Sequence, residues 1–417
     1  MYSSLVTQQA IEQIESDKGI KFHRYTPTQS LDLAAYITER HAQGQVLDSN
    51  NNFVRKADSE FVWNERYLCQ LDFRYFTRYC QIIRDGSVGG GIGSLDLWES
   101  QNILLDLLAR TEESNVETHE RYCFKDVASC LCDGICIVDN KGGRQLGHTA
   151  VSRALTWHRL MLYPHTRAAA VSVDDDKLHK MVEADELIYN NLPFFLKPEI
   201  VYREKEQHFN FNIGSSLIYQ TSEQKSGSGA TVGIGTGGQF DISHLTEVSS
   251  YRYAHMLELD FFPTLPRNPY TLCIMETTPL GRGNWWHEFS EKVRNHKIPR
   301  WKYLYIPFYA EPKKYRAHAP EGWTPDETTK TMAQNVYDTS EEFTGKKVTL
   351  SREQMYWWEQ QYNGALEAGR LNLFLSNYSI TPQQSFQHTS VSAVSVAVLD
   401  WMRSTTKQGA TYTLEGL

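Results

Sequence analysis

Short apolar segments alternate with longer amphipathic ones through the middle of the chain. Mainly apolar runs at 135–139, 168–173, 215–219, 242–245, 272–275 and 303–307 have the length of buried strands. At 149–162, 175–190 and 251–262 apolar residues recur every three or four positions, which predicts helices. Apolar strands separated by helices are typical of a parallel sheet covered on both faces. We therefore expect an α/β core.

The two ends of the chain have a different pattern. Residues 1–60 are polar with helical patches, and helical periodicity returns at 97–108 and 351–369 before a break at 376–382. We predict a core over 61–310 and a small helical lid beside it, built from both chain ends. Residues 1–60 would be its N-terminal segment, and 311–417 its C-terminal segment together with a linker. The glycine-rich run 85–94 can bind phosphate, but it follows a helix rather than a strand, so we interpret it as a flexible connector. The run 226–238 is interpreted as a loop.

Composition narrows the class of protein. A chain of 417 residues with 41% apolar content can bury a core of two or three units. It has no segment resembling a signal peptide and no 18-residue apolar run, so we expect no membrane span. The net charge of −8 argues weakly against a simple DNA-binding protein. DNA contacts would need local cations such as Lys313, Lys314 and Arg316, which otherwise form an ordinary solvated surface, or an oligomer.

Three of the seven cysteines, Cys130, Cys132 and Cys136, stand in or before an apolar strand. No second cysteine pair or histidine pair follows at zinc-finger spacing. We therefore expect reduced, buried thiols rather than a metal site. The odd cysteine count fits a reducing cytoplasm.

Residues 134–149 carry the most informative chemical pattern, an apolar strand followed by a glycine turn and a helix. Gly142, Gly147 and Thr149 match the phosphate-binding pattern G-x-x-x-x-G-K-[ST], whereas His148 replaces its lysine. Glycines let successive N–H groups point inward, and the helix adds its positive end. The Thr149 hydroxyl stands where such a loop binds Mg²⁺. The alternative interpretation is an ordinary strand–turn–helix corner.

A second pattern follows at 240–248, where an apolar strand ends in Glu247. In a P-loop ATPase, one acid on such a strand holds Mg²⁺ and another orients the attacking water. Glu247 fits the second role, but Thr246 stands at the metal-side position. A lone glutamate at a strand end is common, so this pattern is weak by itself. The order of the two patterns along the chain makes the pair informative.

These motifs, in this order, resemble those of the large terminase subunit of tailed double-stranded DNA bacteriophages, an ATPase motor that packages the genome. The resemblance covers about 61–386. Its main segments are Arg144-Gln145-Leu146-Gly147-His148-Thr149, similar to a variant P-loop; Leu245-Thr246-Glu247, similar to the Walker B strand; and Glu276-Thr277-Thr278-Pro279-Leu280-Gly281, similar to the coupling motif. Gln101 resembles the adenine-reading glutamine, and 72–76, 305–308 and 381–386 are further matches.

The resemblance implies ATP and Mg²⁺ as cofactors and a role for each matched residue. Glu247 and Arg144 would be catalytic, Thr149 and Thr246 would bind the metal, and Thr277 and Thr278 would couple nucleotide state to domain motion. The expected ATP-binding residues are Gln101, Gly142, Gly143, Arg144, Gln145, Leu146, Gly147, His148 and Thr149.

The charge lost at His148 leaves alternatives open. A protonated imidazole would supply it, since phosphates favour the imidazolium form. A neutral His148 would leave Arg144 or Lys141 to carry the charge. Arg282 is a candidate arginine for the nucleotide of a neighbouring subunit.

As a function, the resemblance implies an ATP-hydrolysing motor subunit that translocates viral double-stranded DNA into a procapsid. Its partners would be the portal, the small terminase subunit and further copies in a ring, in the host cytoplasm. Asp400 is the only acid between 387 and 412, so we expect no nuclease metal cluster there and no nuclease activity. The linker within 311–417 would therefore lead towards a nuclease domain that we expect to be absent. Two alternatives are a degenerate nucleotide-binding docking subunit and a helicase-like ATPase, which would need a second α/β domain.

Overall fold

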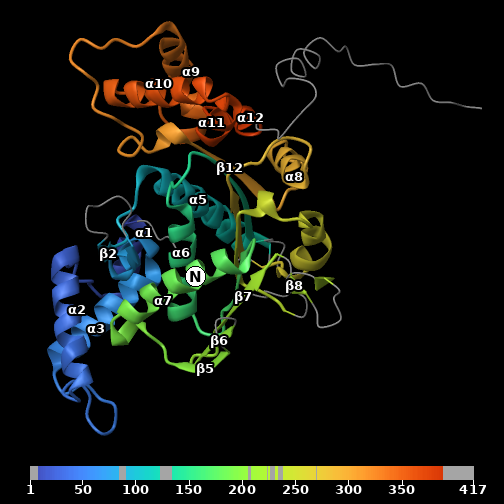
Figure 1. Cartoon of the computed structure of the whole chain (residues 1–417). Helices are drawn as coiled ribbons and strands as arrows, with labels where there is room; N and C mark the ends of the chain where they lie inside the picture. The colour runs from blue at the N-terminus through green and yellow to red at the C-terminus, as the bar shows by residue number, and fades with distance from the viewer. Residues whose placement is uncertain are drawn as a thin grey trace, which may run out of the picture.

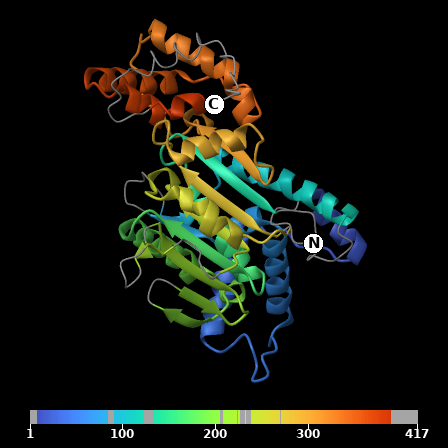
Figure 2. The same cartoon turned by 90° about the vertical axis from the view of Figure 1, so that its right-hand side faces the viewer.

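A computed structural model (Figure 1) describes residues 8–83, 91–122, 134–204, 208–222, 224–225, 231–232, 238–268 and 270–387. Within these ranges, the central sheet has eight strands in the order β12-β3-β11-β10-β4-β7-β6-β5. The strands are β3 Ile135–Gly142, β4 Arg167–Ser172, β5 Ile200–Glu204, β6 His208–Phe211, β7 Ser216–Thr221, β10 Ile242–Thr246, β11 Leu272–Thr277 and β12 Trp301–Pro307. Figure 2 shows these strands side by side beneath the C-terminal helices.

The expected α/β fold with a mainly parallel sheet is confirmed. The strands from β12 to β7 run parallel, whereas β6 and β5 add an antiparallel edge. The sequence pattern did not predict this edge, because β5 is largely exposed and β6 alternates between buried and half-buried positions. Neither strand is therefore a continuous apolar run of the kind used to find the others.

Both faces of the parallel sheet are covered. On β3, Ile135 and Ile137 belong to one apolar core, while Cys136 and Val138 belong to the other. This alternation is what the pleat of a strand buried on both sides requires. Cys136 is a buried free thiol, whereas Cys130 and Cys132 lie outside the described residues. Of the described helices, none combines the length and apolar composition that a membrane crossing requires.

Two predicted helices are confirmed as α6 His148–Leu162 and α7 Asp175–Asn191. The prediction of one regular helix at 251–262 is wrong. The chain there forms a 3-10 turn Ala254–Met256, a π turn Leu257–Phe261 and a second 3-10 turn Phe262–Thr264. Pro263 contributes to this irregularity, because proline has no N–H to donate to a helical hydrogen bond. The helix predicted at 97–108 is longer, α5 Glu99–Tyr122.

The helices from the two chain ends lie apart (Figures 1 and 2). The N-terminal group is α1 Gln8–Lys18, α2 Pro27–Ala42, α3 Lys56–Leu71 and α4 Phe73–Phe76, and α3 and α4 contact α6. The C-terminal group is α9 Glu327–Thr344, α10 Arg352–Glu367, α11 Leu371–Asn377 and α12 Pro382–Ser385, and it contacts β3 and β12. Each group packs on its own part of the core, and the expectation that both chain ends form one lid stays a prediction.

The segment 85–94, expected as a flexible connector, ends in a short strand. Strand β1 Gln81–Ile83 pairs with β2 Ile92–Ser94 in an antiparallel ladder, and residues 84–90 lie outside the described ranges. Helix α8 Trp285–Arg294 follows β11 and packs on the sheet face opposite α6 through Trp286 and Phe289.

Candidate nucleotide site

The strand–loop–helix unit expected from 134–149 is present. Strand β3 ends at Gly142, residues 143–147 form a loop, and α6 starts at His148. The backbone is left-handed at Gln145 (φ 56°) and at Gly147 (φ 73°). Glycine adopts this conformation freely, whereas glutamine does so at a cost. These two residues turn the chain sharply between the strand and the helix.

The carbonyl groups of this loop accept hydrogen bonds from side chains outside the loop. Four consecutive carbonyl oxygens accept a side-chain hydrogen bond each: Arg144 from the Tyr315 hydroxyl, Gln145 from Lys314 Nζ (2.7 Å), Leu146 from Ser100 Oγ (3.4 Å) and Gly147 from Gln101 Nε2 (3.0 Å). In the described part of the chain, the amides of residues 144–146 donate no hydrogen bond. The first amides of α6 also lack helical acceptors. Such a row of N–H donors is an anion site.

Gln101 lies against this loop at the start of α5. Its Oε1 accepts a hydrogen bond from the Trp98 amide at 2.8 Å, and its Nε2 donates to the Gly147 carbonyl. A side chain on Gly147 would collide with this Nε2. The structure thus places Gln101 beside the loop, but both ends of its amide are bonded to the backbone. The reading of adenine by Gln101 stays a prediction.

His148 is buried below the loop. One ring nitrogen, Nδ1, lies 2.6 Å from Asp139 Oδ2, and Nε2 lies 3.2 Å from the Ser100 carbonyl oxygen. Burial alone would lower the pKa of His148, but the Asp139 carboxylate outweighs it and the pKa is raised. Its side chain therefore connects α6 with β3 and α5 instead of pointing to a bound phosphate. Arg144 is exposed on the loop.

A buried ion pair lies next to the start of α6. Lys141 Nζ, from the end of β3, is 3.4 Å from Glu276 Oε2 on β11. Burial would lower the pKa of Lys141, but Glu276 raises it above its usual value. Burial would likewise raise the pKa of Glu276, but Lys141 and neighbouring donors hold it well below its usual range. Both groups are therefore charged in the folded protein.

The two expected metal-binding hydroxyls converge on the same carboxylate. Thr246 Oγ1, at the end of β10, donates to Glu276 Oε1 at 3.0 Å, and Thr149 Oγ1 donates to the same oxygen. His244 Nε2 is 3.2 Å from it. The structure therefore brings Thr149 and Thr246 together, around an acid that sequence reasoning noticed only as the first residue of the coupling motif.

Glu247 follows directly after β10 in a left-handed conformation (φ 59°, ψ 34°). A non-glycine residue held in this region marks a backbone that its surroundings force into place, as at many catalytic sites. With Thr149 and Thr246, Glu247 lines a cavity of about 360 Å³. The predicted catalytic acid, the predicted metal ligands and the start of α6 thus border one space.

The expected coupling residues contact the turn that carries Glu247. The Thr277 and Ser249 hydroxyl oxygens are 2.6 Å apart, and Ser249 Oγ also lies 3.0 Å from the Thr278 carbonyl oxygen. Ser249 follows Glu247 by two residues in the turn Val248–Ser250. The ends of β10 and β11 are therefore bonded to each other beyond their ladder.

Other expected cations lie near the edge of this site. Lys313 and Arg316 are exposed, whereas Lys314 holds the Gln145 carbonyl and lies over the Trp98 ring at 5.0 Å. Lys314 is thus part of the loop's support rather than of a free basic patch. Arg282 is half-buried between β11 and α8. Its role toward a neighbouring subunit stays a prediction.

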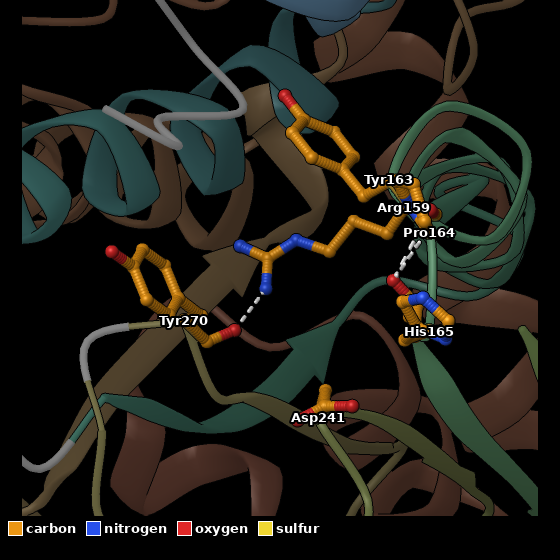
Figure 3. Close-up of a pocket in the computed structure, with 7 residues that line it drawn as sticks. Arg159, Tyr163, Pro164, His165, Asp241 and Tyr270 are labelled. Atoms are coloured by element: carbon orange, nitrogen blue, oxygen red, sulfur yellow. Dashed lines mark hydrogen bonds between the residues drawn. The ribbon is translucent and has the colours of Figure 1, made fainter. Parts of the chain in front are cut away.

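A second cavity, of about 210 Å³, lies at the opposite end of the strands (Figure 3). Arg159 points across it and donates to the Tyr270 carbonyl. The Thr166 hydroxyl donates to the Tyr163 carbonyl at 2.9 Å, and Asp241 Oδ2 accepts from the Arg167 amide at 2.9 Å. Through these hydrogen bonds, the side chains stabilise the loops that precede β4 and β10. We therefore assign this cavity a structural role.

Sequence reasoning did not pick out Asp139 and Ser249 as members of this site, and it named Glu276 only as the first residue of the coupling motif. Asp139 and Lys141 stand two positions apart on β3, so they project from the same face of the strand. That spacing is the signal that could have drawn attention to Asp139. Glu276 and Ser249 carry no such local signal, because their partners come from other strands.

Several solved structures have similar folds. The HK97 bacteriophage large terminase has a TM-score of 0.44 and 12% identity, with 74% of this chain and 53% of that chain covered, so this chain spans about half of its length. The ATPase domain of the Thermus phage P74-26 large terminase gives 0.32 and 16%, with 45% and 83% covered. The large terminase of a thermophilic bacteriophage in complex with ATP-gamma-S gives 0.29 and 14%, with 54% and 49% covered.

No protein-family model and no curated protein sequence matches the chain. At these identities and TM-scores the likeness concerns the fold alone, and no residue role is taken from it. These structural neighbours are large terminases of bacteriophages, the family whose motifs the sequence resembles.

Proposed function

We propose that this chain is an ATP-hydrolysing motor subunit, the ATPase part of a large terminase that moves viral double-stranded DNA into a procapsid. The observation that carries the ATPase proposal is the loop whose four carbonyls accept hydrogen bonds from outside it, with free amides on residues 144–146. Beside it, Glu247 and Thr149 at the start of α6 line one cavity. The motor role, its DNA and its capsid partners are proposed from the motif resemblance.

The positive charge that His148 does not provide would come from two other residues. Lys141 is a buried cation that shares its partner Glu276 with the Thr149 hydroxyl. Arg144 is exposed at the loop, from which its guanidinium can reach a bound phosphate and bind it with two hydrogen bonds. A bound triphosphate would therefore meet one cation from the strand and one from the loop.

The residues at the site also fit magnesium. Mg²⁺ prefers oxygen ligands, and the hydroxyls of Thr149 and Thr246 stand beside the carboxylates of Glu276 and Glu247. When bound, the metal would neutralise charge on the phosphates. The Glu247 carboxylate is the group that would accept a proton from the attacking water or orient it.

One observation favours a second function, a nucleotide-binding docking subunit with little hydrolysis. His148 is bonded at both ring nitrogens, and position 246 carries a hydroxyl where a P-loop ATPase has an acid. If Lys141 and Glu276 do not replace the missing charges, the loop would bind nucleotide without turning it over.

Steady-state ATP hydrolysis, with and without duplex DNA, tests the proposal. We expect DNA-stimulated hydrolysis in the wild type and its loss in Glu247→Gln, with Glu321→Gln, an exposed position, as the matched control. Displacement of a third strand from duplex DNA would report translocation. Equal rates in wild type and Glu247→Gln, together with no ATP binding, would rule out the motor. Tight ATP binding without hydrolysis would favour the docking subunit.

A further inference from the structure

The carboxylate that P-loop ATPases place on the strand of Glu247 is absent from that strand here, because position 246 is a threonine. The structure supplies a carboxylate at the same edge from the next strand. Glu276 on β11 is the ladder partner of Thr246 on β10, and their side chains are bonded at 3.0 Å. Neighbouring strands are only about 4.8 Å apart, so the charge is displaced by one strand spacing.

We propose that Glu276 is the positioning acid of the magnesium site, in the role that the strand of Glu247 has lost at Thr246. Glu276 would hold the Thr149 hydroxyl and place a negative charge behind the metal. This inference rests on the proposed ATP-binding function and adds a residue that the motif resemblance assigns to coupling, not to metal binding.

The direction of one hydrogen bond supports this assignment. Thr149 donates its only hydroxyl hydrogen to Glu276, because the ionised carboxylate can only accept. The lone pairs of the Thr149 oxygen therefore stay available, and a cation is the partner they suit. A carboxylate that orients a metal ligand and increases its basicity is the usual outer partner of a metal site.

The charges of the site are also consistent with this role. The Asp139 carboxylate is bonded to His148 at 2.6 Å, and the buried Arg153 is bonded to Asp185. Beside these two pairs stand the buried cation Lys141 and the two acids Glu276 and Glu247, and Lys177 and Lys180 line the cavity as well. Lys141, Glu276 and Glu247 are thus of the residue types that a complete P-loop site uses, one lysine and two acids.

A structural role alone is the competing explanation, since Lys141 and Glu276 form a buried ion pair. Removing one charge of such a pair is strongly destabilising, whereas replacing both partners by uncharged residues of similar volume is often neutral. The variant Lys141→Met/Glu276→Gln therefore keeps the fold while it removes the acid. The matched control is Arg40→Met/Asp58→Asn, which neutralises a pair bonded at 2.6 Å between α2 and α3.

The experiment compares ATP binding by calorimetry in Mg²⁺ and in EDTA, and takes the ratio of the two affinities within each variant. Both affinities are measured on the same variant, so loss of a phosphate contact from Lys141 lowers both of them and cancels in the ratio. We expect Mg²⁺ to strengthen binding to the wild type and to the control. In Glu276→Gln and in the double variant we expect that gain to fall by about tenfold or more. Glu276→Gln alone should bind ATP in EDTA at least as well as the wild type, since a negative charge is gone.

A rescue variant separates positioning from folding. Thr246→Asp in the Glu276→Gln background returns an acid to the adjacent strand and keeps a partner for Lys141. We expect it to restore most of the Mg²⁺ gain. A wild-type ratio in the folded double variant, or a folded rescue variant without the gain, would overturn the inference while ATP binding by the wild type still supports the proposed function. Absence of ATP binding by the wild type in both arms would instead overturn the proposed function, and this inference with it.

Discussion

The Ser249 and Thr277 hydroxyl oxygens lie 2.6 Å apart, and this contact joins the turn after Glu247 to the end of β11. The two residues belong to different strand ends, and Ser249 also bonds the Thr278 carbonyl. A shift of the turn that carries Glu247 would therefore be passed to the segment 278–284 that leads into α8. This is a short physical route from the proposed site of hydrolysis to the neighbouring helix.

Removal of the Ser249 hydroxyl is predicted to weaken this route without removing the site. In Ser249→Ala we expect ATP affinity close to wild type and a reduced stimulation of hydrolysis by DNA. Thr277→Val should have the same effect, while Thr277→Ser, which keeps the hydroxyl, should not. A double-mutant cycle measured by urea unfolding should give a coupling of about 1 kcal/mol between the two hydroxyls. Additive effects with unchanged DNA stimulation would contradict the coupling role.

Glycine at position 247 is predicted to stabilise the fold while it abolishes hydrolysis. A left-handed backbone costs a residue with a Cβ about 1–2 kcal/mol, and glycine avoids this cost. Glu247→Gly should therefore raise the free energy of unfolding by about 1 kcal/mol. Part of this gain is offset because glycine also increases the conformational entropy of the unfolded chain. Glu247→Ala keeps the strained Cβ and serves as the control. Thermal unfolding that ranks alanine at or above glycine would show that the conformation is not strained.

Gln101 is predicted to determine the preference for adenine. In Gln101→Ala we expect the ratio of ATP affinity to GTP affinity to fall toward one, measured by competition with a fluorescent nucleotide. Because the Trp98 amide and Gly147 carbonyl lose their partner, stability should also fall by about 1–3 kcal/mol. An unchanged ratio with reduced stability would mean that Gln101 only holds the loop.

A histidine away from the site is predicted to make the fold sensitive to acid. Burial lowers the pKa of His158 to about 3, and its Nε2 donates to the Cys69 carbonyl at 2.7 Å. In the unfolded chain the pKa is about 6.5, so below this value only the unfolded state takes up the proton. The contribution is therefore complete above pH 6.5 and is lost progressively as the pH falls toward 3.

At pH 5 this loss amounts to about 2 kcal/mol, because pH 5 lies about 1.5 pH units below the pKa of the unfolded histidine. Urea unfolding at pH 7 and pH 5 should show a drop that is larger by this amount in wild type than in His158→Gln, whose amide can still donate to Cys69. Equal drops in the two proteins would mean that the buried ring is protonated already in the folded state.

The sequence pattern predicted the parallel strands and the strand–loop–helix unit because both are local. Continuous apolar runs identified β3, β10 and β11, and the glycine spacing identified the loop. The edge strands β5 and β6 escaped this reasoning because they are partly exposed. The partners of His148 and Glu276 escaped it for another reason. A ring between Asp139 and Ser100, or a carboxylate shared by Lys141, Thr149 and Thr246, depends on strand order in the sheet, which no single segment encodes.

The pairing of Thr246 with Glu276 also affects how related proteins can be found. Motif searches score one strand at a time, so they record a missing acid at position 246 and rank such a chain as inactive. At the sheet edge, however, the carboxylate has only moved to the adjacent strand. Two lineages can therefore exchange the acid between neighbouring strands and diverge in their motifs while the charge stays in nearly the same place. Surveys of degenerate P-loop proteins would separate active from inactive members better by counting charges at the strand ends of a folded structure.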